Sequence, residues 1–113
     1  MTVQELVTAV PLTVVSGQDA LTRAVTGGYA SDLLSNVMGQ AQQGNVWITM
    51  QGHQNIIAVA SLSNLAAVIV AGGSQPEQEA VKKAESEGVV LLTSPLGVFE
   101  VAGRLHRLGI AGA

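Results

Sequence analysis

A long charge-free segment constrains the fold of this chain more than any other feature. From Leu33 to Gln75 the sequence contains no Asp, Glu, Lys or Arg, and residues 55–73 of it, NIIAVASLSNLAAVIVAGG, approach the length of a transmembrane helix. Polar residues interrupt that run at Ser61, Ser63 and Asn64. We therefore expect a buried helix followed by a buried strand, and no membrane span.

Helix and strand patterns alternate along the chain. Short, mostly apolar stretches predict strands at residues 12–17, 25–28, 46–50, 66–73 and 89–92. Apolar residues at helical spacing predict helices at residues 2–10, 31–41, 55–62, 74–87 and 94–108. This alternation predicts an α/β fold of three layers, in which a mostly parallel sheet of about five strands carries helices on both faces. Because the connections are short, residues 1–113 are expected to form one domain.

Polar and glycine residues predict where the helices begin and end. Ser31 is a candidate cap for the helix that follows it, and Ser74 with Glu77 has the spacing of a capping box. Gly44 fits a left-handed cap after one helix, and Gly88 is expected to end another.

Three expectations concern packing. The helix from Ser31 is expected to bury one face, made of Leu33, Leu34, Val37, Met38 and Ala41. Trp47 and Met50 lie in a predicted strand and are expected in the core. Residues 18–24 are too few for a parallel crossover, so the first two strands should be antiparallel or not adjacent.

The composition excludes several classes of function. The net charge is −3 and the five basic residues are scattered, so we expect no nucleic acid partner. The chain has no cysteine and no metal-ligand spacing, which argues against disulfides and a metal site. The amino-terminal residues contain no Lys or Arg and include Glu5, unlike a secretory signal, so we expect a cytoplasmic location. With 48% apolar and 12% charged residues, self-association is expected.

The stretch VTGGYASDLL, residues 25–34, suggests a ligand-binding turn. We expect Gly27 and Gly28 to lie between a strand and a helix, where positive φ angles let a ligand approach the backbone. A plain tight turn explains the same glycines. No P-loop or dinucleotide-binding glycine pattern is present, and Asp32 would repel a phosphate. Thr26, Ser31 and Asp32 are therefore expected to bind a sugar, a base edge or a neighbouring loop.

Polar residues also follow the next predicted strand. The carboxyl ends of strands line the ligand crevice in open parallel sheets, so Gln51, His53 and Asn55 are expected to join the glycine-turn residues at one edge. His53 equally fits a simpler role as a cap at the start of a helix. No catalytic set can be assembled with confidence, and no enzymatic activity is expected, although His53 with Asp32 is an enzymatic alternative.

The stretches VVSG, LTRAVTGG and TGGYASDLL resemble the DRTGG domain, and the match covers nearly the whole chain. Thr26, Gly27 and Gly28 keep the end of the motif that names the family, with Ala24 and Val25 before them. The family is similar in fold to the N-terminal domain of HPr kinase/phosphorylase and, more distantly, to the UDP-binding N-terminal domain of Mur ligases. The stretch GNVWITMQGHQNIIAVASLSNLAAVIV looks like the corresponding strand, turn, helix and strand of the Mur domain.

The resemblance implies a regulatory or accessory module. Such domains lie between CBS domains in some pyrophosphatases, where they contribute to dimer contacts, and stand-alone copies accompany iron hydrogenase genes. The kinase relative carries its chemistry in a separate P-loop domain, so kinase activity is not implied. We therefore expect a non-catalytic, cofactor-free module that homodimerises and senses a nucleotide-like small molecule. The alternative is a structural interaction protein that holds a larger redox enzyme, such as an iron hydrogenase system.

Overall fold

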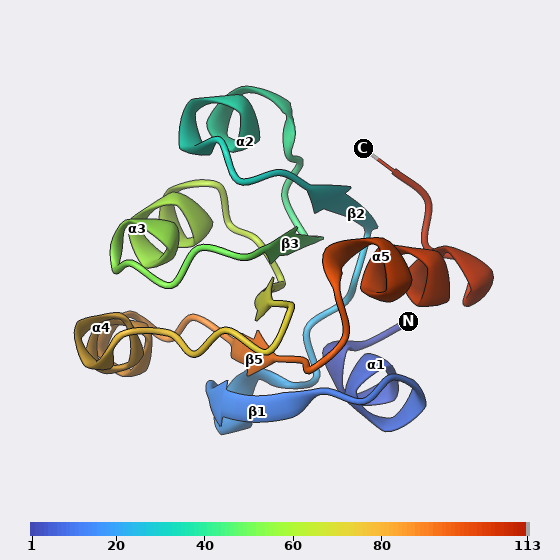
Figure 1. Ribbon diagram of the computed structural model, residues 1–113, viewed down its shortest axis with the longest axis horizontal. Helices are drawn as coiled ribbons and strands as arrows, with labels where there is room; N and C mark the ends of the chain where they lie inside the picture. The colour runs from blue at the N-terminus through green and yellow to red at the C-terminus, as the bar shows by residue number, and fades with distance from the viewer. Residues whose placement is uncertain (113) are drawn as a thin grey trace.

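A five-stranded mixed sheet forms the middle layer of the structure, a computed structural model in which residues 1–112 are described (Figure 1). The strands are β1 (Thr13–Ser16), β2 (Gly27–Ala30), β3 (Asn45–Thr49), β4 (Ala67–Val70) and β5 (Leu91–Thr93), in the spatial order β1-β5-β4-β3-β2. Strands β2 to β5 run parallel, and β1 pairs antiparallel with β5. The expectation that the first two strands are not parallel neighbours is confirmed.

Helices cover both faces of the sheet, as the alternation of patterns predicts. The helices are α1 (Val3–Ala9), α2 (Leu34–Gln40), α3 (Asn55–Leu62), α4 (Gln78–Glu87) and α5 (Val98–Arg107), with a short 3-10 turn η1 (Gln18–Ala20) after β1. Helices α2, α3 and α4 stand in a row on one face, and α1 and α5 lie on the other (Figure 1). The three-layer α/β prediction is confirmed.

The charge-free segment supplies the centre of the molecule. Every residue of β3 and β4 is buried, and alternate side chains point to opposite faces. Trp47 and Val68 pack with α2, α3 and α4, whereas Ile48 and Ile69 pack with α1 and α5. A buried helix followed by a buried strand is therefore the correct interpretation of this segment. No helix within residues 1–112 has the length and apolar character needed to cross a bilayer.

Helix α2 differs from its prediction in both its start and its buried face. It begins at Leu34, and the hydroxyl of Ser31 instead accepts a hydrogen bond from the Leu33 amide at 3.1 Å, within the loop. Val37 is its buried residue, while Leu33 is 65% and Met38 is 55% exposed. The reason is position: α2 stands at the end of the row of helices beside the edge strand β2, so little of its surface meets the sheet (Figure 1).

The predicted starts of the last two long helices are also too early. Glu77 is the N-cap of α4 and no side chain caps the helix, so the Ser74–Glu77 capping box is wrong. The Glu77 amide instead donates to the Gly52 carbonyl at 2.9 Å, which ties two loops together. Ser94 extends β5, donating its amide to Val70, and α5 begins at Val98. The predicted end of α4 at Gly88 is confirmed, and Gly88 is left-handed with φ 68°.

Gly44 and Met50 lie in different elements from those expected. Gly44 is left-handed with φ 82°, but it belongs to the turn before β3, because α2 has already ended with Ala41 as its cap. Trp47 is fully buried as predicted, whereas Met50 is 49% exposed because β3 ends at Thr49 and Met50 starts the following loop.

Candidate functional site

The paired glycines do not form a turn. Gly27 and Gly28 are the first two residues of β2, and neither has a positive φ angle. A Cβ atom at Gly27 would lie 3.0 Å from the Ala111 carbonyl oxygen and 3.0 Å from Asn45 Nδ2. The Gly28 amide donates to the same Ala111 carbonyl at 2.8 Å. The glycines therefore let the carboxyl-terminal tail lie against β2, and the predicted strand-to-helix turn at these residues is wrong.

Thr26 lies at the opposite edge of the sheet from Asp32. Strands β2 and β3 are parallel, with Gly27 opposite Asn45 and Ala30 opposite Ile48, so residues before β2 and residues after it are separated by the strand. The Thr26 hydroxyl donates to the Gln43 carbonyl at 2.7 Å, and the same hydroxyl oxygen accepts a hydrogen bond from Asn45 Nδ2 at 3.2 Å. The expected single cluster is thus wrong for Thr26, Gly27 and Gly28, which lie toward the amino ends of the strands.

The other predicted residues follow the carboxyl ends of β2 and β3, and we call Ser31, Asp32, Gln51, His53 and Asn55 the carboxyl-edge site. The Asp32 carboxylate accepts, through Oδ1, hydrogen bonds from the Thr49 hydroxyl at 2.6 Å and the Met50 amide at 2.8 Å. Gln51 Nε2 donates to the Asp32 carbonyl at 2.7 Å. These contacts fasten the loop after β2 to the loop after β3.

His53 has the capping role that was the simpler interpretation of the sequence. Its Nδ1 accepts a hydrogen bond from the Asn55 amide at 3.1 Å, at the first turn of α3. Because Nδ1 is the acceptor, the neutral ring carries its proton on Nε2, and His53 is exposed. Asp32 Oδ1 bonds to Thr49 and Met50 and not to His53 within the described residues, so no acid–base pair is formed here.

The loops after β4 and β5 complete this edge of the sheet. The Gly72 amide donates to Leu96 at 2.7 Å and the Gly73 amide donates to Ser94 at 3.0 Å, both through backbone carbonyls. Both glycines have positive φ angles, 79° and 76°. Sequence reasoning missed Thr49, whose position near the end of a predicted strand, two residues before Gln51, is the signal that would have indicated it.

The chemistry available at the carboxyl-edge site is recognition by hydrogen bonds. It offers one carboxylate, two side-chain amides and an imidazole, all exposed to solvent. The amino ends of α2 and α3 lie beside them, since both helices follow directly from these loops. Within residues 1–112 no group of three or more His, Asp or Glu side chains is placed to hold a metal ion.

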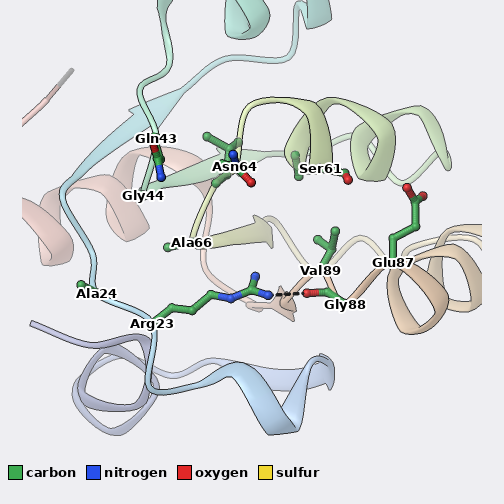
Figure 2. A pocket seen from close by; sticks show the side chains of 12 residues that line it. Arg23, Ala24, Gln43, Gly44, Ser61, Asn64, Ala66, Glu87, Gly88 and Val89 are labelled. Atoms are coloured by element: carbon green, nitrogen blue, oxygen red, sulfur yellow. Dashed lines mark hydrogen bonds between the residues drawn. The ribbon is translucent and has the colours of Figure 1, made fainter.

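A cavity of about 390 Å³ lies at the other edge of the sheet, beside the amino ends of the strands (Figure 2). We call it the amino-edge pocket. It is lined by Arg23, Ala24, Gln43, Gly44, Ala60, Ser61, Asn64, Leu65, Ala66, Glu87, Gly88 and Val89. Sequence reasoning did not identify this pocket, because its lining comes from five separate segments. Asn64 lines the pocket and has a left-handed φ of 51°, which is uncommon for a residue other than glycine. This backbone conformation cannot be predicted from the sequence.

Comparison with known proteins agrees with the fold. Among curated proteins, none matches the chain. A solved structure of the CBS and DRTGG domains from the regulatory region of the Clostridium perfringens pyrophosphatase, complexed with the activator diadenosine tetraphosphate, is similar with a TM-score of 0.74 and 13% identity. The likeness covers 92% of this chain and 45% of that one, so the chain spans less than half of that structure. The family model of the DRTGG domain matches residues 5–108, and the chain therefore belongs to the DRTGG domain family.

Proposed function

We propose that this chain is a regulatory module without catalytic activity of its own, which binds a nucleotide-like small molecule at the carboxyl-edge site. Family membership supports the regulatory role, because the similar pyrophosphatase region is regulatory and is complexed with a nucleotide activator. In open parallel sheets, ligands bind outside the carboxyl ends of the strands. The proposal therefore rests on the segments that follow β2 and β3, which carry Asp32, Gln51, His53 and Asn55.

The arrangement of Asp32 is the observation that carries this proposal. Both of its side-chain contacts within residues 1–112 go to Oδ1, so Oδ2 can accept a hydrogen bond from a ligand. The contacts from Thr49 and Met50 fix the carboxylate before any ligand arrives, which lowers the entropy lost on binding. A fixed carboxylate suits the hydroxyls of a ribose or the amino group of a base, and the amide of Gln51 and the Nε2 proton of His53 add donors and an acceptor.

A panel of nucleotides tests the proposal by thermal denaturation. The panel contains diadenosine tetraphosphate, ATP, AMP, adenosine and UDP. A ligand at a hundredfold excess over its dissociation constant stabilises the fold by about 2.7 kcal/mol. For a domain of this size that amounts to about 10 °C in Tm. Unchanged melting temperatures across the whole panel would reject the ligand part of the proposal.

A pair of glutamine variants locates the site. Gln51→Ala removes a carboxyl-edge side chain and should weaken the nucleotide shift. Gln18→Ala removes an exposed glutamine of η1, away from this edge, and should leave the shift unchanged. Equal shifts in the two variants would show that a nucleotide binds elsewhere.

Exposed apolar side chains support association as a second part of the proposal. Phe99 is 91% and Leu62 is 77% exposed, and burying such apolar side chains against a second copy is favourable. We propose that two copies associate, and light scattering over a range of concentrations should give the mass of a dimer. The alternative is a structural interaction protein that holds a larger redox enzyme. It would be favoured by a constant monomer mass, by co-purification of such an enzyme and by melting temperatures that do not respond to nucleotides.

A further inference from the structure

The amino-edge pocket contains two opposite charges that do not pair with each other. Arg23 stretches along one wall, and Glu87, the last residue of α4, stands across the opening (Figure 2). Arg23 Nη2 donates to the Gly88 carbonyl at 2.8 Å. Within the described residues neither side chain has an ion-pair partner, because the salt bridges there join Lys82 with Glu79 and Arg104 with Glu100.

The contact with Gly88 fixes the Arg23 guanidinium and leaves most of its hydrogen-bond donors available. Arginine has five N–H donors in a fixed planar fork, and this contact occupies one of them. The remaining donors can bind a carboxylate through two parallel hydrogen bonds. Arg23 is thus positioned in advance to bind a ligand carboxylate.

The rest of the rim favours a positive group. Helices α3 and α4 both end at this pocket, with Ser61 and Glu87 in their last turns. A helix carboxyl end carries a partial negative charge, which attracts an ammonium group and repels a phosphate. The carboxylate of Glu87 adds to the same effect.

The floor of the pocket is apolar and built of small side chains. Ala60, Leu65, Ala66 and Val89 line it and are each at most 5% exposed. Such a floor accepts an aliphatic group of modest size. A cavity of about 390 Å³ lies within the range of small-molecule sites.

We propose that the amino-edge pocket binds a small zwitterion of the α-amino acid class. Arg23 binds its carboxylate, Glu87 and the partial negative charge at the ends of α3 and α4 attract its ammonium group, and the side chain lies on the apolar floor. This site is separate from the carboxyl-edge site, because the strands lie between the two edges. The proposal does not depend on nucleotide binding.

Isothermal titration calorimetry with defined amino acids tests the proposal on the full chain. The probes are L-alanine, L-valine, L-leucine and L-glutamine, each compared with its N-acetyl and carboxamide derivatives. At least one free amino acid should bind saturably, and its two derivatives should bind at least about tenfold more weakly, since each lacks one charge-assisted contact. No saturable binding at millimolar concentrations, or equal binding of a derivative, would overturn the proposal.

Charge-neutralising variants assign the two roles. Arg23→Gln should abolish the preference for the free amino acid over its carboxamide, and Glu87→Gln should reduce the preference over the N-acetyl derivative. Arg107→Gln and Glu85→Gln remove matched exposed charges that do not line the pocket, and they should bind as the parent chain does.

If Arg23→Gln unfolds because the contact with Gly88 is lost, Arg23→Lys is used in its place. This second variant keeps the positive charge. It should retain the preference over the carboxamide with lower affinity, because lysine offers no planar fork. Binding in all three pocket variants equal to that in the controls would refute the assignment, whatever the nucleotide panel shows.

Discussion

Gly17 provides the sharpest test of how the fold is packed. It follows β1 with φ 91° and ψ 26°, a left-handed conformation. A Cβ atom at this position would lie 2.7 Å from Val90 Cα and 2.9 Å from Val90 Cγ2. Val90 is fully buried beside β5, so its backbone cannot move without disturbing the sheet. Gly17→Ala therefore combines a backbone cost with a steric one.

The two costs can be estimated separately. A left-handed conformation costs a non-glycine residue about 1–2 kcal/mol. Overpacking a well-filled site costs about 1–3 kcal/mol. We therefore expect Gly17→Ala to lower the free energy of unfolding by about 3 kcal/mol. For the 113-residue chain the unfolding entropy is about 0.24 kcal/mol per kelvin, so the expected fall in Tm is about 12 °C.

Two control variants separate the contributions when measured with Gly17→Ala by urea and thermal denaturation. Gly109 has φ 98° with open space around it, so Gly109→Ala should show the backbone cost alone, about 1–2 kcal/mol. Gly103 lies inside α5 with no atom near its missing Cβ, so Gly103→Ala should stabilise the chain by up to about 1 kcal/mol. If Gly17→Ala costs no more than Gly109→Ala, the close approach to Val90 has no energetic consequence and the reasoning is wrong.

Three further variants address other contacts. Trp47→Phe removes a fully buried indole, whose Nε1 donates to the Ser31 carbonyl at 2.8 Å. It should lower the free energy of unfolding by about 2 kcal/mol in urea titrations followed by circular dichroism. A loss under about 0.5 kcal/mol would contradict this prediction. Thr2→Ala breaks the capping box that Thr2 forms with Glu5 and should cost about 1 kcal/mol in thermal denaturation, with an unchanged Tm as the opposing result. Glu100→Gln breaks the exposed ion pair with Arg104 and should lower the free energy of unfolding by less than about 0.5 kcal/mol in urea titrations. This loss should disappear in high salt, and a loss that persists there would contradict the prediction.

The layered fold was predictable because its signals are local. The absence of charge from Leu33 to Gln75 favours burial, and strands that are buried on both faces are typical of parallel sheets covered by helices. Helix α3 and strands β3 and β4 follow directly from that segment. Trp47 at full burial is the clearest example.

Three of the eight predicted site residues could not be placed from the sequence, because their position depends on distant contacts. The sequence around Gly27 and Gly28 is typical of a strand-to-helix turn, yet these glycines make room for Ala111, a residue near the other end of the chain. Once they belong to β2, Thr26 moves to the opposite edge from Asp32. By contrast, Asp32 and Gln51 were placed correctly, because both directly follow strands that are parallel neighbours.

The antiparallel strand at the edge of the sheet has a consequence for synthesis of the protein. Thr13 of β1 pairs with Thr93 of β5, and β5 is the sheet neighbour of β1. A nascent chain therefore exposes β1 on the ribosome while most of the remaining sequence is still being translated. Because β5 follows β2, β3 and β4 in the chain, β1 completes its pairing only after those strands have been made, and its unpaired edge is open to aggregation until then.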